Sequence, residues 1–334
     1  MTIREELELR ERKDLSPLAC LSSQSKGRER PVEPCPVRTC FQRDTDRIVH
    51  SKAFRRLKHK TQVFLRPEGD HYRTRMTHTL EVAQIAKTIC RGLGLNADLC
   101  EAAALGHDLG HTPFGHAGER LLNEIMPGGF RHYEQSLRVA DRLENGGEGL
   151  NLTYEVRRGI LCHSGPQLAE TLEGRVVRIS DKIAYLSADI DDALRGGVIY
   201  PLDIPAEVAQ TLGTTHAQRL NTLITDIIER SRGKTEILQS PEVKEAMAEL
   251  RKFMFASVYT NPMAKGEEGK AQELIRRLFD HYLAHMDALP VEYLDIMEKE
   301  GKERAVCDYI AGMTDAYAVE TFEELFIPKA WTVK

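Results

Sequence analysis

Histidines gather in one stretch of this 334-residue chain, since eight of its twelve lie between His50 and His132. The densest group is GHDLGHTPFGH, which runs from Gly106 to His116 and holds three histidines and one aspartate. A lone histidine on an apolar face is usually a hydrogen-bonded core residue. Several ionisable rings in one apolar setting are costly to bury unless they bind a cation or an anion. The cluster therefore predicts an ion-binding site.

A divalent metal is the ion that the residue types favour. The adjacent pair His107 and Asp108 offers a ring nitrogen and an anionic oxygen to one ion. His78, four residues before Val82 on the inward face of an expected helix, could supply a second nitrogen. Asp181 is the best candidate for a fourth ligand, because a buried carboxylate without a partner is costly. Such a set suits Mn, Fe, Co, Ni, Zn or Mg, and the lack of cysteine ligands argues against structural zinc.

Helices are needed to bring these side chains together. Apolar residues recur at helical spacing over five stretches, namely 77–93, 97–109, 133–144, 153–163 and 175–194. The last stretch is apolar on two sides, which is typical of a buried central helix. Asp181 lies on one of its stripes, and Tyr185 and Asp189 follow on the same side at i+4 and i+8.

The rest of the chain adds further helices and one loop-rich segment. Amphipathic helices continue beyond Pro205. Residues 14–40 hold four prolines, which predicts a loop or arm that a partner subunit could order. At most a short β-hairpin is expected near residues 62–73, turning at 67–70. The predicted fold class is all-α.

The composition is that of a globular protein, with 41% hydrophobic and 29% charged residues. No apolar run approaches the roughly 18 residues that span a bilayer, and the N-terminus lacks the apolar stretch of a secretory signal. We therefore expect a cytoplasmic protein without a membrane partner. Seven cysteines without a CxxC pair argue against a disulfide framework.

Charge is spread unevenly along the chain, whose net charge is −5. Residues 43–75 contain ten Lys and Arg against four Asp and Glu, a sum of +6, so the remainder sums to −11. An acidic chain is a poor general binder of nucleic acid, but a positive segment within it favours a local anionic partner. A solvated charged surface would explain the segment equally well.

The order of a histidine, a His–Asp pair and a distant aspartate resembles the HD-domain phosphohydrolase superfamily. Longer motifs resemble one branch of it, the dGTPase-like deoxynucleoside triphosphate triphosphohydrolases. These motifs are FQRD, DRI, HSKAFRRL and KTQVF within 41–64, RTR and THTLEV within 73–82, ALGHDLGHTPFGHAGE over 104–119 and SDKIAY over 180–185. The resemblance is strong over residues 15–200 and weak over the C-terminal helices.

The resemblance implies a helical HD-domain core over residues 71–197. An N-terminal arm and basic segment would occupy 1–70, and helices over 198–334 would pack on the core as one continuous unit. The implied activity is metal-dependent hydrolysis of dGTP or several dNTPs to the deoxynucleoside and tripolyphosphate. The divalent metal, such as Mn, Mg or Fe, would be bound by His78, His107, Asp108 and Asp181.

The resemblance also implies which side chains take part in catalysis. His116 would be the catalytic histidine and would give a proton to the leaving 5′ oxygen. Glu119, three residues later, would orient the ring and favour its charged form. His111 would act beside them at the phosphates. The other side chains expected to meet phosphate oxygens are Arg75, His132 and Lys182.

Three further residues are implied to contact the sugar. Tyr185 stacked under the ribose would leave no room for a 2′ hydroxyl, which selects deoxynucleotides through a clash. Asp189 would accept a hydrogen bond from the 3′ hydroxyl, and Gln62 would also touch the sugar. Related enzymes are often homo-oligomers activated by dNTPs at subunit contacts, so a second copy of the chain and a dNTP activator are expected partners.

Two other functions stay open at the level of sequence. The chain could be an HD-type phosphodiesterase or 5′-nucleotidase that acts on monophosphates or cyclic nucleotides. It could also be a sensor of nucleotides or single-stranded nucleic acid in which turnover is incidental, because the basic segment permits such binding. No residue predicts a preference for one base.

Overall fold

The computed structural model describes residues 1–62, 73–261 and 266–329. These residues form helices, and the only β-contacts among them are two isolated bridges, Arg28–Thr153 and Thr61–Thr74. The all-α prediction is confirmed. Most of the predicted hairpin near 62–73 lies outside the described residues. None of the helices described has both the length and the apolar character needed to cross a bilayer.

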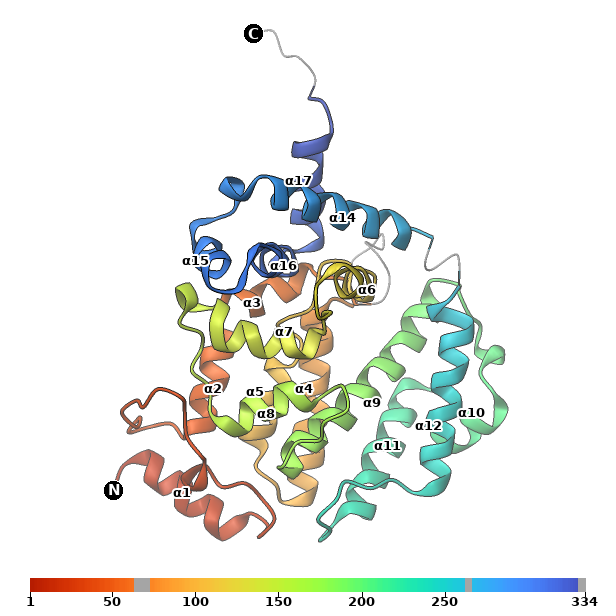
Figure 1. The fold of residues 1–334 in the computed structure, drawn as a ribbon. Coiled ribbons are helices and arrows are strands. Elements are labelled where there is room, and N and C mark those ends of the chain that lie inside the picture. Colours follow the sequence, from red (N-terminus) through yellow and green to blue (C-terminus); the bar gives the residue numbers. More distant parts are fainter. Residues whose placement is uncertain (63–72, 262–265, 330–334) are drawn as a thin grey trace, which may run out of the picture.

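Four helices form the core beside the candidate site. Helix α4 (Arg75–Leu93) packs against α5 (Ala97–Gly106) and α9 (Leu172–Arg195), while α8 (Tyr154–Cys162) packs against α5 and α9 (Figure 1). The Thr74 side chain caps the start of α4 by accepting from the Thr77 amide. Most of α9 is buried, in agreement with the predicted central helix.

Two predicted helices end earlier than their periodicity indicates. The helix expected over 97–109 ends at Gly106, because the chain then turns to bring Gly110 against α7 (His132–Arg138). A Cβ atom at Gly110 would lie 2.1 Å from the Ser136 amide nitrogen, so only glycine fits there. The helix expected over 133–144 is α7 followed by a π-helical turn at Val139–Leu143.

Two apolar cores organise the described chain. The first joins α4, α5, α8 and α9 with α2 (Cys40–Val49), α3 (Lys52–Arg56), α10 (Ala206–Leu212), α11 (His216–Ser231) and α12 (Pro241–Met254). The second joins α6 (His116–Ile125) with α14 (Glu268–Ala284), α15 (Val291–Glu300), α16 (Lys302–Gly312) and α17 (Asp315–Phe326). We call residues 268–326, drawn in blue in Figure 1, the C-terminal lobe. Helix α6 lies inside the predicted HD core by sequence but packs on this lobe. The boundaries at residues 70 and 197 stay a prediction.

The N-terminal arm is held by its own chain. After α1 (Ile3–Asp14), the buried guanidinium of Arg28 pairs with Asp44 and donates to the Cys40 carbonyl at 2.9 Å. Glu155 accepts from the Ser25 hydroxyl and the Lys26 amide, both at 2.7 Å. These contacts order the arm against α2 and α8, so it needs no partner subunit for this, contrary to the sequence-based expectation.

Candidate active site

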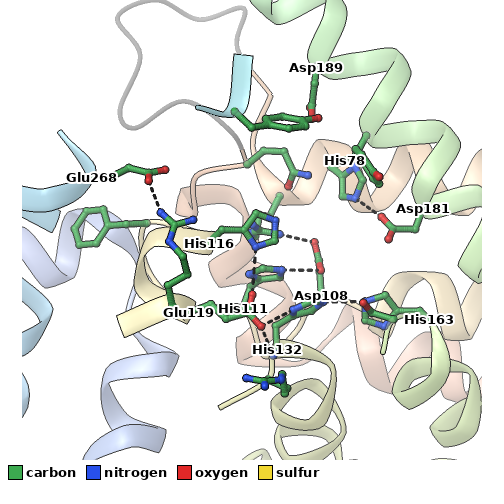
Figure 2. A pocket seen from close by; sticks show the side chains of 18 of the residues that line it. His78, Asp108, His111, His116, Glu119, His132, His163, Asp181, Asp189 and Glu268 are labelled. Carbon is green, nitrogen blue, oxygen red and sulfur yellow. Dashed lines mark hydrogen bonds and ion pairs between the residues drawn. The ribbon is translucent and has the colours of Figure 1, made fainter. Parts of the chain in front are cut away.

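A cavity of about 600 Å³ lies between the HD core and α6, α7 and α12. Most of the side chains expected at the site line it (Figure 2), namely Gln62, Arg75, His78, Asp108, His111, His116, Glu119, His132, Asp181, Tyr185 and Asp189. His107 lies directly behind this lining, with its Nε2 3.4 Å from Asp108 Oδ1. Lys182 is also absent from the cavity lining.

Lys182 is exposed and does not line the cavity, so its expected phosphate contact stays a prediction. Lys182 follows Asp181 on α9, and one residue along a helix turns the side chain by about 100°. Asp181 therefore faces the cavity while Lys182 is exposed. Burial and the charges of Arg178 and Arg251 lower the pKa of Lys182. Sequence adjacency to a candidate metal ligand thus did not place this residue in the cavity lining.

Four candidate metal ligands meet from three elements, and we call them the His–Asp cluster. His78 comes from α4, His107 and Asp108 follow α5, and Asp181 comes from α9. Asp181 Oδ1 lies 3.1 Å from His78 Nε2 and 3.9 Å from His107 Nε2. Atoms bound at about 2.0–2.2 Å to one ion stand about 3–4 Å apart. The ligand atoms of His78, His107 and Asp108 all lie within 4.8 Å of one another, as a single-ion site requires, and Asp181 lies beside two of these residues.

The protonation of His107 shows that the cluster fits a cation. Its Nδ1 lies 2.6 Å from the Ala104 carbonyl oxygen, to which it must donate, because a carbonyl only accepts. This leaves Nε2 with a lone pair that is buried and has no hydrogen-bond partner among the described residues. The lone pair faces the carboxylates of Asp108 and Asp181. Metal-bound histidines usually donate their second nitrogen to a carbonyl or carboxylate in this way.

Both carboxylates of the cluster stay ionised at neutral pH. Burial opposes this for Asp108, but His107, His111 and Arg75 hold its pKa well below the ordinary value. Burial also opposes it for Asp181, whose pKa is lowered by the hydrogen bond from His78 and by the neighbouring His107 ring. Two neighbouring anions in a buried site strengthen the case for a divalent cation.

Arg75 is buried at the edge of the cluster. Its Nη1 donates to Asp108 Oδ2 at 2.9 Å, and its Nε and Nη2 are buried with no partner among the residues described. A surface pairing of Arg75 with Glu81 does not occur, because Glu81 pairs with Arg73 at 2.9 Å. The two remaining N–H groups of Arg75 are thus available to an anionic ligand in the cavity.

Glu119 joins two histidines into what we call the Glu119 hub. Its Oε2 lies 3.2 Å from His116 Nδ1, and its Oε1 lies 2.8 Å from His132 Nδ1 and 2.9 Å from the His132 amide. Burial opposes ionisation of Glu119, but the hydrogen bonds from His116 and His132 hold its pKa far below the ordinary value. The carboxylate therefore accepts from both rings. The His116 side chain is 63% exposed, so it is open to a ligand.

His111 lies between the His–Asp cluster and the Glu119 hub. Its ring stacks on that of His132 with centroids 4.3 Å apart, and its Nε2 is 3.5 Å from Asp108 Oδ1. Burial and the charge of Arg75 hold the pKa of His111 well below the ordinary value. The ring is therefore neutral at physiological pH and offers one N–H.

A third group of polar side chains lies near α9 and the end of α12. The Tyr259 hydroxyl donates to Asp189 Oδ2, while Asp189 Oδ1 is buried without a partner in the described chain. Burial raises the pKa of Asp189 to about 7 despite that hydrogen bond. Burial also raises the pKa of Tyr185 to about 12. Gln62 adds a buried and unpartnered Oε1 to this end of the cavity.

Comparison with known proteins places this geometry in a family. The HD domain pattern matches residues 75–186, and the phosphohydrolase-associated domain pattern matches 237–324. A deoxyguanosinetriphosphate triphosphohydrolase-like protein of Caldanaerobacter subterraneus subsp. tengcongensis is 56% identical, covering 99% of this chain and 98% of that protein. The chain belongs to this family.

Other relatives of the family match over a similar span. Proteins of the same description from Desulfatibacillum aliphaticivorans and Clostridium perfringens (strain SM101 / Type A) are 51% and 48% identical, each covering 98% of this chain and 99% of the relative. The HD match encloses the whole His–Asp cluster, and the chain is a hydrolase of the HD phosphohydrolase type. The second match covers α12 and nearly all of the C-terminal lobe, where the sequence motifs resembled the family only weakly.

Several cavity residues escaped the sequence analysis. Arg251, Phe255 and Tyr259 recur every four residues along α12 and the π-helical turn after it, a spacing that could have marked one functional face. No local signal pointed to His163, which packs its ring 4.8 Å from that of His107. Other lining residues that the sequence did not suggest are Phe114, Arg120, Asn123, Arg131, Ser164, Thr260 and Glu268.

The basic segment, residues 43–75, contributes little to the cavity lining in its described part. Of its described residues, only Gln62 and Arg75 line the cavity. Arg47 donates to the Leu150 carbonyl at 2.5 Å, and Arg43 donates to the Glu33 carbonyl at 2.7 Å. Much of the local positive charge thus fastens backbone segments instead of facing a ligand.

Proposed function

We propose that this chain hydrolyses a deoxynucleoside triphosphate, dGTP or several dNTPs, to the deoxynucleoside and tripolyphosphate. One observation carries the proposal: His78, Asp108 and Asp181 of the His–Asp cluster line the same cavity as the Glu119 hub (Figure 2). Hydrolysis of a phosphate ester is assisted by a bound cation and by a group that transfers a proton. The volume of the cavity lies in the range of small-molecule sites. The relatives named for dGTP support the substrate class.

The His–Asp cluster would hold the divalent cation, with Mn, Mg and Fe as candidates. A bound cation would supply Lewis-acid chemistry at a phosphate group. Arg75 anchors Asp108 through Nη1 and directs its remaining N–H donors toward phosphate oxygens. His111, which is neutral, and His132 would donate further hydrogen bonds to the triphosphate.

His116 would serve as the general acid. Its Nδ1–H is bonded to the Glu119 carboxylate, so Nε2 is free to carry the proton that the departing 5′ oxygen needs. The anionic Glu119 stabilises the charged ring and fixes its orientation. Because Glu119 also binds His132, one carboxylate sets both histidines relative to the phosphates.

The deoxyribose would lie at the Asp189 end of the cavity. Asp189 Oδ1 has no partner within the described chain and would accept from the 3′ hydroxyl. Tyr185 under the sugar would exclude a 2′ hydroxyl, and Gln62 would donate or accept at the sugar edge. Tyr259, bonded to Asp189, would keep that carboxyl group in place.

Product analysis tests the proposal. The purified protein is incubated with each dNTP and each rNTP, alone and mixed, with Mn²⁺ or Mg²⁺, and nucleoside and tripolyphosphate are separated by chromatography. We expect equal amounts of deoxynucleoside and tripolyphosphate, and no turnover by a His107→Ala variant. Orthophosphate released from monophosphates, or cleavage of cyclic nucleotides alone, would instead identify a nucleotidase or phosphodiesterase.

The same assay addresses the expected partners. We also propose a cytoplasmic homo-oligomer in which a dNTP bound at subunit contacts activates hydrolysis. Faster turnover of a mixture than of any single dNTP would support an activator. Tight retention of single-stranded DNA with a steep salt dependence and no turnover would favour the sensor function.

A further inference from the structure

The loop between His111 and His116 has a backbone that needs external support. Phe114 has φ 61°, and Gly115 follows with φ 56°. A positive φ is unfavourable for a residue with a side chain and persists only where surrounding contacts impose it. Because this loop leads directly into α6, its conformation decides where the His116 ring stands.

A buried carboxylate of the C-terminal lobe supplies this support. Asp315, in the first turn of α17, is 5% exposed, and its Oδ1 accepts from the Phe114 amide at 2.9 Å. Its Oδ2 accepts from the Thr61 amide at 3.0 Å and from the Thr61 hydroxyl. Thr61 immediately precedes Gln62. One carboxylate thus holds both the His116 side and the Gln62 side of the cavity.

A buried lysine strengthens the same junction. The Lys60 ammonium is fully enclosed and donates to the carbonyl of His111 and, at 2.9 Å, to the carbonyl of Ala311 at the end of α16. The loop is therefore held at His111 by Lys60, which also binds the C-terminal lobe, and at Phe114 by Asp315, which belongs to that lobe. The His–Asp cluster has no such dependence, since its members stand on α4, α9 and the end of α5.

We propose that Asp315 is a positioning residue, through which the C-terminal lobe fixes the Thr61–Gln62 backbone and the Phe114–His116 backbone relative to each other. It acts through Thr61 and Phe114 and lies outside the cavity lining. This inference rests on the proposed function, in which His116 donates a proton to the substrate. A displacement of about 1 Å in a reacting group costs up to about 100-fold in rate.

The substitution Asp315→Asn tests this role in the full-length, metal-loaded protein. The asparagine can still accept from the Phe114 amide through Oδ1. Its side-chain NH₂ group, however, would face the Thr61 N–H, and two donors cannot form a hydrogen bond. We expect kcat for dGTP to fall about 10-fold to 100-fold, with KM and metal content per chain nearly unchanged. Hydrogen exchange of the peptide over 110–118 should accelerate. Asp287→Asn, at an exposed position on the same lobe and outside the cavity lining, is the matched control and should match the wild type.

A second variant keeps the test decisive if Asp315→Asn does not fold. Thr61→Val removes only the hydroxyl arm and should lower kcat by a smaller factor in the same direction. Wild-type kcat and exchange in a folded Asp315→Asn protein, or a loss of activity no larger than the loss of folded protein, would overturn the role. If the wild type hydrolyses no dNTP, the proposed function alone fails, and exchange over 110–118 then decides whether Asp315 holds the loop.

Discussion

The two walls of the cavity differ in what holds their side chains. The metal wall carries the His–Asp cluster and stands on α4, α9 and the end of α5, which pack on one another in the first apolar core. The acid wall carries the Glu119 hub and stands on the loop over 111–116, α6 and α7. Its α6 packs on the C-terminal lobe. Helix packing fixes the metal wall, whereas polar contacts from a distant part of the chain fix much of the acid wall.

The C-terminal lobe holds the acid wall through several contacts, and two of them come from buried aspartates. Asp315 binds the loop, as described above, and Asp308 of α16 binds α7. Asp308 is fully buried and accepts at 2.8 Å from both Gln135 Nε2 and Arg138 Nε. In the proposed function, cation binding and proton transfer would therefore depend on different parts of the molecule, and mutations should separate them.

Loss of a metal-wall ligand should have the largest effect. His107→Gln keeps a polar side chain but removes the lone pair that faces Asp108 and Asp181. We expect turnover to fall at least about 1,000-fold, because the charge that stabilises the transition state is lost. Elemental analysis should show loss of bound metal with the helical circular dichroism signal retained. A variant that loses activity but keeps its metal would show that the cluster is not the cation site.

Loss of the proton donor should be smaller and should leave the metal in place. In His116→Ala, the Glu119 hub keeps His132 but loses the ring that reaches the ligand. General-acid catalysis contributes about 100-fold to 10,000-fold, so kcat should fall within that range. Metal content measured beside kcat is the critical readout. Release of metal by this variant would mean that the two walls are one unit.

Breaking the second lobe contact should act mainly on stability. Asp308→Asn removes a charge that faces Arg138 and Arg304, which are mostly buried. Arg138 keeps its pair with Glu300 and Arg304 keeps its hydrogen bond to Gln135, so the lost charge-assisted bonds cost about 1–3 kcal/mol, and thermal unfolding should begin a few degrees lower. The folded protein should still bind metal. Asp287→Asn is again the matched control, and an unchanged melting temperature for Asp308→Asn would contradict the assigned role of α16.

The metal wall could be predicted from sequence because its signals are local. Apolar periodicity places His78 and Asp181 on inward helix faces. The His107–Asp108 pair stands out because it lies in the densest group of histidines in the chain. The end of α5 at Gly106 could not be read from periodicity, because a close backbone approach to Ser136 decides it. Local pattern thus identified the ligands but not the turn that presents two of them.

Much of the acid wall could not be predicted, because its contacts join distant segments. Asp315 lies 201 residues from Phe114 and 254 from Thr61, and a lone aspartate after a threonine carries no signal of such contacts. His163 reaches the Glu119 hub from 31 residues away, through a hydrogen bond of 3.3 Å between its Nε2 and that of His132. Lys182 shows the opposite case, since sequence adjacency to Asp181 was given weight where helix geometry turns the side chain out of the cavity lining, and its phosphate contact stays a prediction.

The smallest expected effect is a change with pH in the preference for substrates that carry a 3′ hydroxyl. It would set the titrating Asp189 at the sugar end of the cavity apart from the metal wall, which helix packing holds in place. Burial raises the pKa of Asp189 to about 7, so its carboxyl group is protonated below that pH and anionic above it. A carboxylate is the stronger acceptor for a 3′ hydroxyl. The ratio of kcat/KM for dGTP over 2′,3′-dideoxy-GTP should therefore rise a few-fold as pH increases through about 7.

Asp189→Asn should give a ratio that does not change with pH, because an amide does not titrate. A wild-type ratio that is constant between pH 6 and 8 would remove Asp189 from the 3′ contact while leaving the His–Asp cluster and the Glu119 hub unaffected.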